Sequence, residues 1–274
     1  MRSDEHGESS FAGFHVLPEG CTAKVLSLTT PGDVCRLSLV DKTFLSAAKS
    51  DAVWERFLPS DYENIIARSV TPSPTVFSFK RDLYIHLCDH PLLIDGGSKS
   101  FSLEKFSGKK CYMLAARNLK IVWADTPQYW TWTSLPESRF AEVAELHVVW
   151  WLEICGKIDT CILSPNTTYE AYLVFKLARE AYGFHHPPSE VSVGIVGDKS
   201  ETQYVYLDRS TRRESGVQYP KERGDGWLEI KLGEFVNHRG EDGELEMTLM
   251  EVKGGVGKEG LIVEGIEIRP KRPN

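Results

Sequence analysis

From about residue 99 onward, apolar and polar residues alternate along the chain, and this period of two constrains the fold more than any other feature. The segments that show it are 119–123, 145–154, 170–177, 227–232 and 244–249. Short segments with one apolar face, separated by Gly, Pro and Asn, are typical of the antiparallel strands of a β-sandwich. Because no helical pattern lies between them, parallel βαβ units are not expected.

A slip of phase near the C-terminus predicts an irregularity in the last strand. Leu261 and Val263 are odd-numbered, whereas Ile266 and Ile268 are even-numbered. One extra residue at Gly265 would return both apolar pairs to the same face of the sheet. We therefore predict a β-bulge at Gly265.

Residues 14–58 have helical spacing instead. Thr30 can cap a helix, Pro31 suits its first turn, and Asp33 stands where a capping box places its acid. A segment this short cannot bury all of its large apolar side chains by itself. We therefore expect part of its surface to need a partner. The alternative is a helical cap that packs on the C-terminal domain.

These patterns predict an α+β, multidomain chain. Residues 1–13 are polar and are expected to form a disordered tail. The helical module covers 14–58, and a connector of helix and loop covers 59–98, with a helix over Phe79–Cys88. The antiparallel β-sandwich is expected to occupy 99–274.

Composition and charge argue against several classes of protein. The formal net charge of −7 does not suit a nucleic-acid surface, and no apolar stretch reaches the ~18 residues of a membrane helix. The N-terminus lacks the apolar stretch of a secretory signal. Six cysteines show no CxxC pair and no disulfide-framework spacing, so we expect free thiols in a reducing compartment. These features predict a cytoplasmic protein, with the nucleus as a second location, and neither nucleic-acid nor membrane partners.

The sequence holds no recognisable catalytic or metal-binding motif. GxSxG, HExxH and Gly-rich phosphate loops are absent. His147, Cys155 and Cys161 lack the spacing of metal ligands. Glu244 and Glu246 lie two apart and could suggest a pair of glycosidase carboxylates, although charged strand faces are common. We expect a protein that is not an enzyme and that needs no cofactor or metal.

Residues 14–58 also resemble the F-box, the helical module that docks on the small adaptor subunit of cullin–RING ubiquitin ligases. The matching blocks are 17–19, 25–28, 30–34, 37–40 with Lys42 and Phe44, and 53–54. The sequence departs from the pattern at 20–22, where an acid followed by leucines is usual. The resemblance implies contact with the cullin through the adaptor. It also implies a set of adaptor-binding residues, which are Leu17, Pro18, Val25, Leu28, Pro31, Val34, Leu37, Val40, Phe44 and Trp54.

Residues 99–271 resemble the phloem protein 2 family, and within it the tobacco-type (Nictaba-like) lectins. The matching blocks are 111–117, 121–132, 142–146, 151–158, 169–177, 225–235 and 260–271. An F-box followed by this domain is the arrangement of one branch of the family. The resemblance implies a jelly-roll-like lectin sandwich.

In that family, the positions of Trp123, Trp130, Glu244 and Glu251 are implicated in binding N-acetylglucosamine oligomers and N-glycan cores. An indole ring can stack on the apolar face of a sugar, and carboxylates accept hydrogen bonds from its hydroxyls.

The pattern alone leaves alternatives open for each of these residues. Trp123 is in phase with the apolar residues of its segment, which favours the core. For Trp130 the pattern favours neither the core nor the surface. For Glu244 it favours a solvent-exposed strand face. Glu251 lies in the inward phase, so either the strand has ended or the acid faces a group that it binds. We interpret Trp150, Trp151 and Trp227 as structural.

Together these features predict a substrate receptor of a cullin–RING ubiquitin ligase. Its helical module would hold the adaptor, and its sandwich would hold a glycan-bearing or otherwise marked target. One alternative is a lectin whose helices are only a structural cap. Another is a receptor that reads a protein surface without sugar, and the weakest is a glycosidase.

Overall fold

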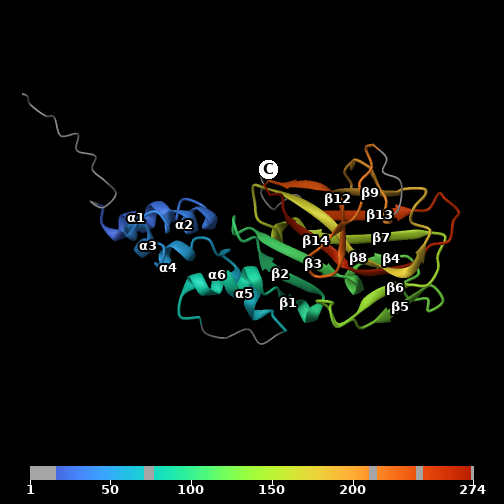
Figure 1. Cartoon of the computed structure of the whole chain (residues 1–274), viewed down its shortest axis with the longest axis horizontal. Coiled ribbons are helices and arrows are strands. Elements are labelled where there is room, and N and C mark those ends of the chain that lie inside the picture. The colour runs from blue at the N-terminus through green and yellow to red at the C-terminus, as the bar shows by residue number, and fades with distance from the viewer. Residues whose placement is uncertain (1–16, 71–76, 210–214, 239–242, 273–274) are drawn as a thin grey trace, which may run out of the picture. The chain divides into compact units, whose positions relative to one another are not determined.

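The computed structural model describes residues 17–70, 77–209, 215–238 and 243–272 (Figure 1). The tail expected over 1–13 lies outside these residues. The chain forms two compact units. The described residues of Met1–Ser60, Val76–His86 and Lys105–Gly108 make the first unit, and those of Asp61–Thr75, Leu87–Glu104 and Lys109–Asn274 make the second. Residues of the expected connector therefore contribute to both units.

The first unit is helical, as predicted. It contains α1 (Glu19–Leu26), α2 (Pro31–Leu37), α3 (Lys42–Ala47), α4 (Asp51–Trp54) and the N-terminal part of α6 (Lys80–Asp89). The predicted start of α2 is confirmed, because the Thr30 hydroxyl oxygen accepts a hydrogen bond of 3.1 Å from the Asp33 amide. The longest described helix, α6, has 10 residues, so no helix among the described residues could cross a bilayer.

The core of the helical unit is built around Trp54, which is 2% exposed. Its indole N–H donates a 2.7 Å hydrogen bond to the Ala48 carbonyl oxygen, and its ring lies 5.2 Å from that of Tyr84. Leu26 and Val34 are fully buried in the same unit. Side chains from α1, α2 and α4 therefore fix these short helices, none of which would be stable alone.

The second unit contains α5 (Tyr62–Ala67), three short 3₁₀ turns (Asp95–Gly97, Ala116–Asn118 and Thr160–Ile162) and two antiparallel sheets. The nine-stranded sheet has the order β1 (Leu92–Ile94), β2 (Lys99–Leu103), β3 (Lys110–Ala115), β14 (Glu259–Pro270), β8 (Thr167–Tyr182), β12 (Leu228–Asn237) and β11 (Lys221–Glu222). Its remaining strands are β6 (Val143–Leu146), which pairs with β14, and β5 (Trp130–Thr133), which pairs with β6. The five-stranded sheet has the order β10 (Gln203–Val205), β9 (Ser189–Ile195), β13 (Glu244–Glu251), β7 (Leu152–Asp159) and β4 (Lys120–Ile121).

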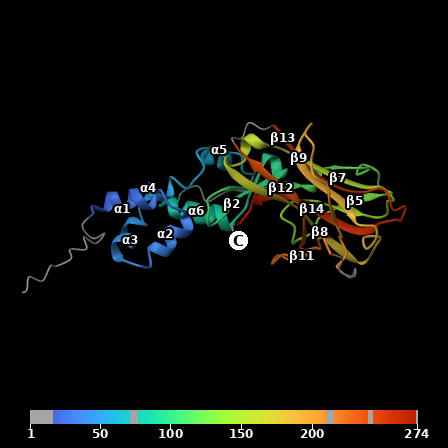
Figure 2. The same cartoon turned by 90° about the horizontal axis from the view of Figure 1, so that it is seen from above.

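The two sheets pack face to face, which confirms the predicted sandwich. A Cβ atom at Gly156 in β7 would lie 2.9 Å from the Ile266 Cδ1 atom in β14. A Cβ atom at Gly233 in β12 would lie 2.9 Å from Val193 Cγ2 in β9. Figure 2 shows β9 and β13 on one side of this unit, and β14 and β8 on the other. The apolar phase of each strand therefore fills the space between the sheets.

A bulge in β14 is confirmed, one residue before the predicted position at Gly265. The pairing of β14 with β8 shifts register between Val263 and Gly265, so Glu264 is the extra residue. The Glu264 carboxylate is buried and accepts hydrogen bonds from the Arg139 amide at 2.7 Å and the Ser138 hydroxyl at 3.2 Å. Burial raises the pKa of this carboxyl group. The bulge thus places a polar side chain in the sheet without leaving it unpaired.

Two segments predicted as strands are interrupted. The segment 119–123 forms only the two-residue β4, because Trp123 has a φ of 62° and turns the chain. The segment 145–154 is divided between β6 and β7, which belong to different sheets. Residues 147–151 carry the chain from one sheet to the other, where an isolated bridge of Val149 to Lys258 continues the strand-like pattern.

None of the six cysteines forms a disulfide bond, as predicted. Cys155 lies in β7 and is 8% exposed. Burial raises the pKa of its thiol to about 11. Cys155 therefore stays protonated at neutral pH and lacks the thiolate that a nucleophile requires.

Candidate functional site

Four connecting segments meet at one end of the sandwich. Because β13 is antiparallel to β7 and β9, and β7 is antiparallel to β4, the ends of β4 and β13 lie beside the starts of β7 and β9. We call this region the loop end. Its segments are 122–129, 147–151, 183–188 and 252–258.

Backbone contacts hold the segments of the loop end together. The Val149 amide donates to the Lys258 carbonyl at 3.0 Å, and the Lys258 amide donates to the Val149 carbonyl at 2.7 Å. The His147 amide donates to the Tyr129 carbonyl at 2.8 Å. A Cβ atom at Gly183 would lie 2.2 Å from the Gly257 carbonyl oxygen. The loop end is therefore closely packed, as expected of a scaffold that presents binding groups.

Exposed apolar side chains gather at two places in the described chain. Of the seventeen large apolar residues that are exposed, twelve lie either in segment 17–45 of the helical unit or at or beside the loop end. The six in segment 17–45 are Leu17, Val25, Leu28, Leu39, Val40 and Leu45. The six at or beside the loop end are Trp123, Trp150, Trp151, Tyr182, Tyr204 and Val256. Concentrated apolar exposure of this kind marks a binding surface.

Trp123 belongs to the surface, and its assignment to the core from strand phase is wrong. Its positive φ takes it out of the strand, and its side chain is 46% exposed. The Trp123 ring lies 5.3 Å from the ring of Tyr129, at an interplanar angle of 40°. The exposed Trp123 ring and the half-buried Tyr129 ring together form an aromatic surface, which we call the first platform.

Trp130 is buried rather than exposed. It lies in β5 opposite Leu146 and is 2% exposed. Its indole N–H has no hydrogen-bond partner among the described residues. Its ring contributes to packing and is not available for stacking on a ligand.

Glu251 faces the protein and not the solvent. One carboxylate oxygen accepts hydrogen bonds from the amides of Lys253 at 3.0 Å and Gly254 at 2.8 Å. The other forms an ion pair with Lys258, whose side chain is 1% exposed. Lys258 Nζ also donates to the Trp150 carbonyl at 3.1 Å. The group that the inward-facing acid binds is therefore part of the chain itself, and Glu251 fixes the shape of segment 252–258.

Glu244 lies at the opposite end of β13 from Glu251. Glu244 pairs with Asp159 and Glu251 with Leu152, so seven residue steps, or roughly 24 Å, separate them. Lys157 Nζ lies 3.1 Å from a Glu244 carboxylate oxygen. The same Nζ lies 3.3 Å from a carboxylate oxygen of Glu246. Glu244 and Glu246, the two acids considered as glycosidase carboxylates, therefore share one lysine as their partner. The structure thus brings Trp123, Glu251 and the buried Trp130 to the loop end, but not Glu244.

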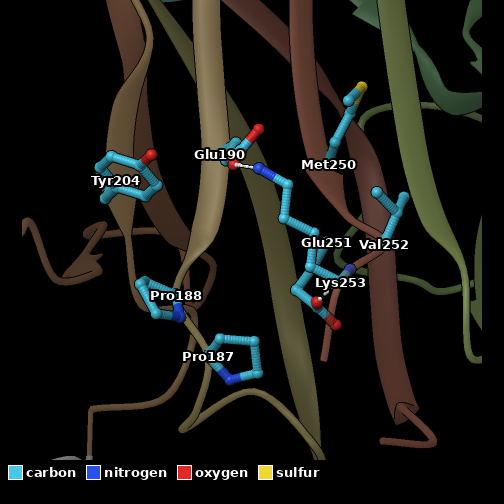
Figure 3. Close-up of a pocket in the computed structure, with 8 residues that line it drawn as sticks. All are labelled: Pro187, Pro188, Glu190, Tyr204, Met250, Glu251, Val252 and Lys253. Atoms are coloured by element: carbon cyan, nitrogen blue, oxygen red, sulfur yellow. Dashed lines mark hydrogen bonds and ion pairs between the residues drawn. The ribbon is translucent and has the colours of Figure 1, made fainter. Parts of the chain in front are cut away.

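An open hollow of about 200 Å³ lies beside segment 252–258. Lys253 forms an ion pair with Glu190 across it, and Figure 3 shows the Tyr204 ring on the same side as Glu190. Sequence reasoning missed this hollow, since its residues come from three strands and two loops. Its lining consists of Pro187, Pro188, Glu190, Tyr204, Met250, Glu251, Val252 and Lys253.

The ten residues expected to bind the adaptor do not share one environment. Five are exposed, Leu37 is half-buried, and the other four are buried. The expectation that all ten contact a partner is therefore corrected, because the buried members form the core of the helical unit. Leu39, 87% exposed, and Leu45, 44% exposed, were missed and join the surface. The exposed members are Leu17, Pro18, Val25, Leu28 and Val40, and the buried members are Pro31, Val34, Phe44 and Trp54.

A metal centre finds no support in the part of the chain that the structure describes. No group of three or more His, Cys, Asp or Glu side chains lies close enough there to hold an ion. The exposed groups at the loop end are aromatic rings, hydroxyls and an ion pair, which suit binding of a ligand by stacking and hydrogen bonding.

Comparison with known proteins covers nearly the whole chain. The family model for phloem protein 2 matches residues 109–270. F-box protein PP2-B10 of Arabidopsis thaliana is 47% identical over 268 residues, which are 97% of this chain and 97% of that protein. F-box protein PP2-B1 of the same plant is 40% identical, and the match covers 100% of this chain and 94% of that protein.

Solved structures show only a distant likeness. A family 35 carbohydrate-binding module from Clostridium thermocellum has a TM-score of 0.32 and 9% identity, covering 58% of this chain and 96% of that chain. The module TmCBM61, solved in complex with β-1,4-galactotriose, has a TM-score of 0.27 and 10% identity, covering 57% of this chain and 83% of that chain.

Proposed function

Because this chain belongs to the phloem protein 2 family, we propose that it is a non-catalytic receptor subunit of a cullin–RING ubiquitin ligase. Its helical unit binds the small adaptor subunit of the ligase and reaches the cullin through it. The loop end of its sandwich binds a glycan on a target protein, with N-acetylglucosamine oligomers or N-glycan cores as the ligand. The observation that carries this proposal is the gathering of exposed apolar side chains at these two surfaces. The role places the protein in the cytoplasm or nucleus.

The adaptor-binding role is supported by how the helical unit divides its apolar residues. Val34 and Trp54 build a core that is complete without the exposed residues. Leu28, Leu39 and Val40 are 64%, 87% and 73% exposed, and a small unit gains nothing for its own stability from such exposure. These side chains are free to fill the apolar centre of an interface. The relatives' name of F-box protein agrees with this role.

We expect Val40→Asp to weaken binding of the ligase adaptor at least tenfold. The change places a charge in an apolar interface, and losing a dominant contact there costs about 2 kcal/mol or more. Purified adaptor titrated against the full chain in a calorimeter gives the affinity. Val196→Asp is the matched control, since Val196 is also an exposed valine, at 45%, but lies outside the helical unit. Equal affinity of the two variants would contradict adaptor docking by the helical unit.

The first platform supports the glycan-binding role. Trp123 and Tyr129 present neighbouring rings from a segment that backbone hydrogen bonds fix at both ends. Sugar rings have an apolar C–H face that suits stacking on such rings, and burying it removes apolar surface from water. Because Glu251 is engaged within the protein, its contribution is to hold segment 252–258 in place and not to contact the sugar.

We expect Trp123→Ala to weaken binding of chitotriose at least tenfold, because the substitution removes half of the first platform. Trp130→Phe should leave the affinity unchanged, because Trp130 is buried and its indole N–H makes no hydrogen bond in the described chain. Calorimetric titration of both variants measures the difference. If Trp123→Ala binds chitotriose as the wild type does, the assignment of the first platform is wrong.

A further inference from the structure

Two other exposed aromatic rings converge at the loop end over Gly257. A Cβ atom at Gly257 would lie 3.3 Å from the Tyr182 hydroxyl oxygen and 3.7 Å from Trp150 Cε2. It would also lie 3.5 Å from Val148 Cγ2. The side chains come from the end of β8 and from segment 147–151, so elements far apart in the sequence meet at one glycine. We call Trp150, Tyr182 and Val148 the second platform.

The exposure of the second platform is not explained by the fold. Trp54, Trp130 and Trp227 fill the cores of the two units and are 2%, 2% and 1% exposed. Trp150 is 57% exposed and Tyr182 is 45% exposed. The chain therefore buries large rings where it uses them for packing, and these two rings add little to the core.

The backbone beneath the second platform is rigidly held. Val149, next to Trp150, makes two backbone hydrogen bonds with Lys258. The buried Lys258 ammonium also donates to the Trp150 carbonyl, and Glu251 neutralises its charge. A ring that is fixed before binding loses little conformational freedom when a ligand stacks on it.

The chemistry of the second platform suits a neutral ring. Its members are uncharged, and the two charges buried beneath it compensate each other. The Tyr182 hydroxyl can donate a hydrogen bond to a hydroxyl group or accept one from it. A flat apolar surface bordered by hydrogen-bonding groups matches the face and rim of a sugar.

The two platforms stand on backbone segments that lie close together. The Tyr129 carbonyl accepts a hydrogen bond from His147, which is three residues from Trp150. Three residues span at most ~11 Å, so the backbones of Tyr129 and Trp150 are separated by no more than roughly 14 Å. A short oligosaccharide spans such a distance.

Given the glycan binding proposed for the loop end, we propose that Trp150 and Tyr182 form a second saccharide-stacking subsite. It takes one ring of a neutral oligosaccharide, while another ring of the same chain stacks on Trp123 and Tyr129. Each added sugar unit then increases affinity until both platforms are covered.

A length series of N-acetylglucosamine oligomers tests the second platform. The wild type and Trp150→Ala are titrated with the series from the disaccharide to the pentasaccharide. We expect the wild type to gain affinity along the series. Trp150→Ala should match the wild type for the disaccharide and lose about five- to tenfold for the pentasaccharide, because it lacks one stacking surface. Tyr182→Ala should show the same dependence on length.

Val236→Ala is the control. Val236 is also an exposed apolar residue, at 45%, but it lies in β12 opposite Thr168, away from the loop end. We expect it to bind every oligomer as the wild type does. If Trp150→Ala and Tyr182→Ala also equal the wild type at every length, the second subsite is wrong while the first platform stands. If the wild type binds no oligomer, glycan recognition and the second subsite both fail.

Discussion

Replacing Lys258 by methionine is expected to lower the free energy of unfolding by about 3–5 kcal/mol. The Lys258 and Glu251 side chains are 1% and 3% exposed, so the substitution leaves a carboxylate buried without its counter-charge. It also removes the donor to the Trp150 and Val256 carbonyl groups. Urea unfolding followed by tryptophan fluorescence measures the loss.

The double variant Glu251→Gln/Lys258→Met separates charge from packing. Glutamine keeps a carbonyl oxygen that can accept from the Lys253 and Gly254 amides, and no unpaired charge remains. We expect the double variant to be more stable than Lys258→Met alone, because the two effects are not additive for residues in contact. If the double variant loses as much unfolding free energy as Glu251→Gln and Lys258→Met lose together, the two side chains have no coupling free energy.

Replacing Gly265 by alanine is expected to destabilise the sandwich by about 3 kcal/mol or more. A Cβ atom at this position would lie 2.0 Å from the Leu114 carbonyl oxygen, so β14 and β3 could not keep their pairing. The bulge fixes the backbone at this point, which leaves the strand little freedom to move away. The midpoint of urea unfolding reports the change.

Gly224→Ala provides the control for Gly265→Ala. Gly224 has no atom within 4 Å of where its Cβ would lie, and its backbone does not require glycine. We expect its unfolding free energy to stay within about 0.5 kcal/mol of the wild type. Equal stability of the two variants would show that the sheet accommodates a side chain at the bulge.

Local features of the sequence predicted the fold well. The phase slip in the last strand located the bulge to within one residue, because side-chain direction in a strand depends only on position along the chain. The cap at Thr30 was predictable for the same reason, since its hydrogen bond joins residues three apart. The inward phase of Glu251 left two alternatives open, and the structure shows a buried acid paired with Lys258 at the last residue of β13.

Features that depend on tertiary neighbours were not predictable. A positive φ at a tryptophan is uncommon and has no signature in the surrounding residues, so Trp123 was read as part of a strand. Residues 147–151, which connect the two sheets, still alternate as a strand does, because Val149 forms an isolated bridge with Lys258. Trp150 and Trp151 were interpreted as structural, since exposure depends on the loops that surround them.

The helical unit shows the same limit. Helical spacing identified its apolar residues, but it could not separate those that form the core from those that face outward. Val34 and Val40 both fit the pattern, yet they are 0% and 73% exposed. The difference arises from the packing of α1, α3 and α4 around Trp54, which a short, loosely patterned segment does not reveal.

Simultaneous capture of both partners tests most directly whether one chain carries two separate binding surfaces. Immobilised N-acetylglucosamine oligomers are incubated with the full chain and the purified ligase adaptor. We expect the beads to retain the adaptor only when the chain is present. Val40→Asp should remain on the beads without the adaptor, and Trp123→Ala should leave both in solution. Retention of the wild-type chain without the adaptor, or of neither protein, would contradict a receptor that joins a ligase to a glycan.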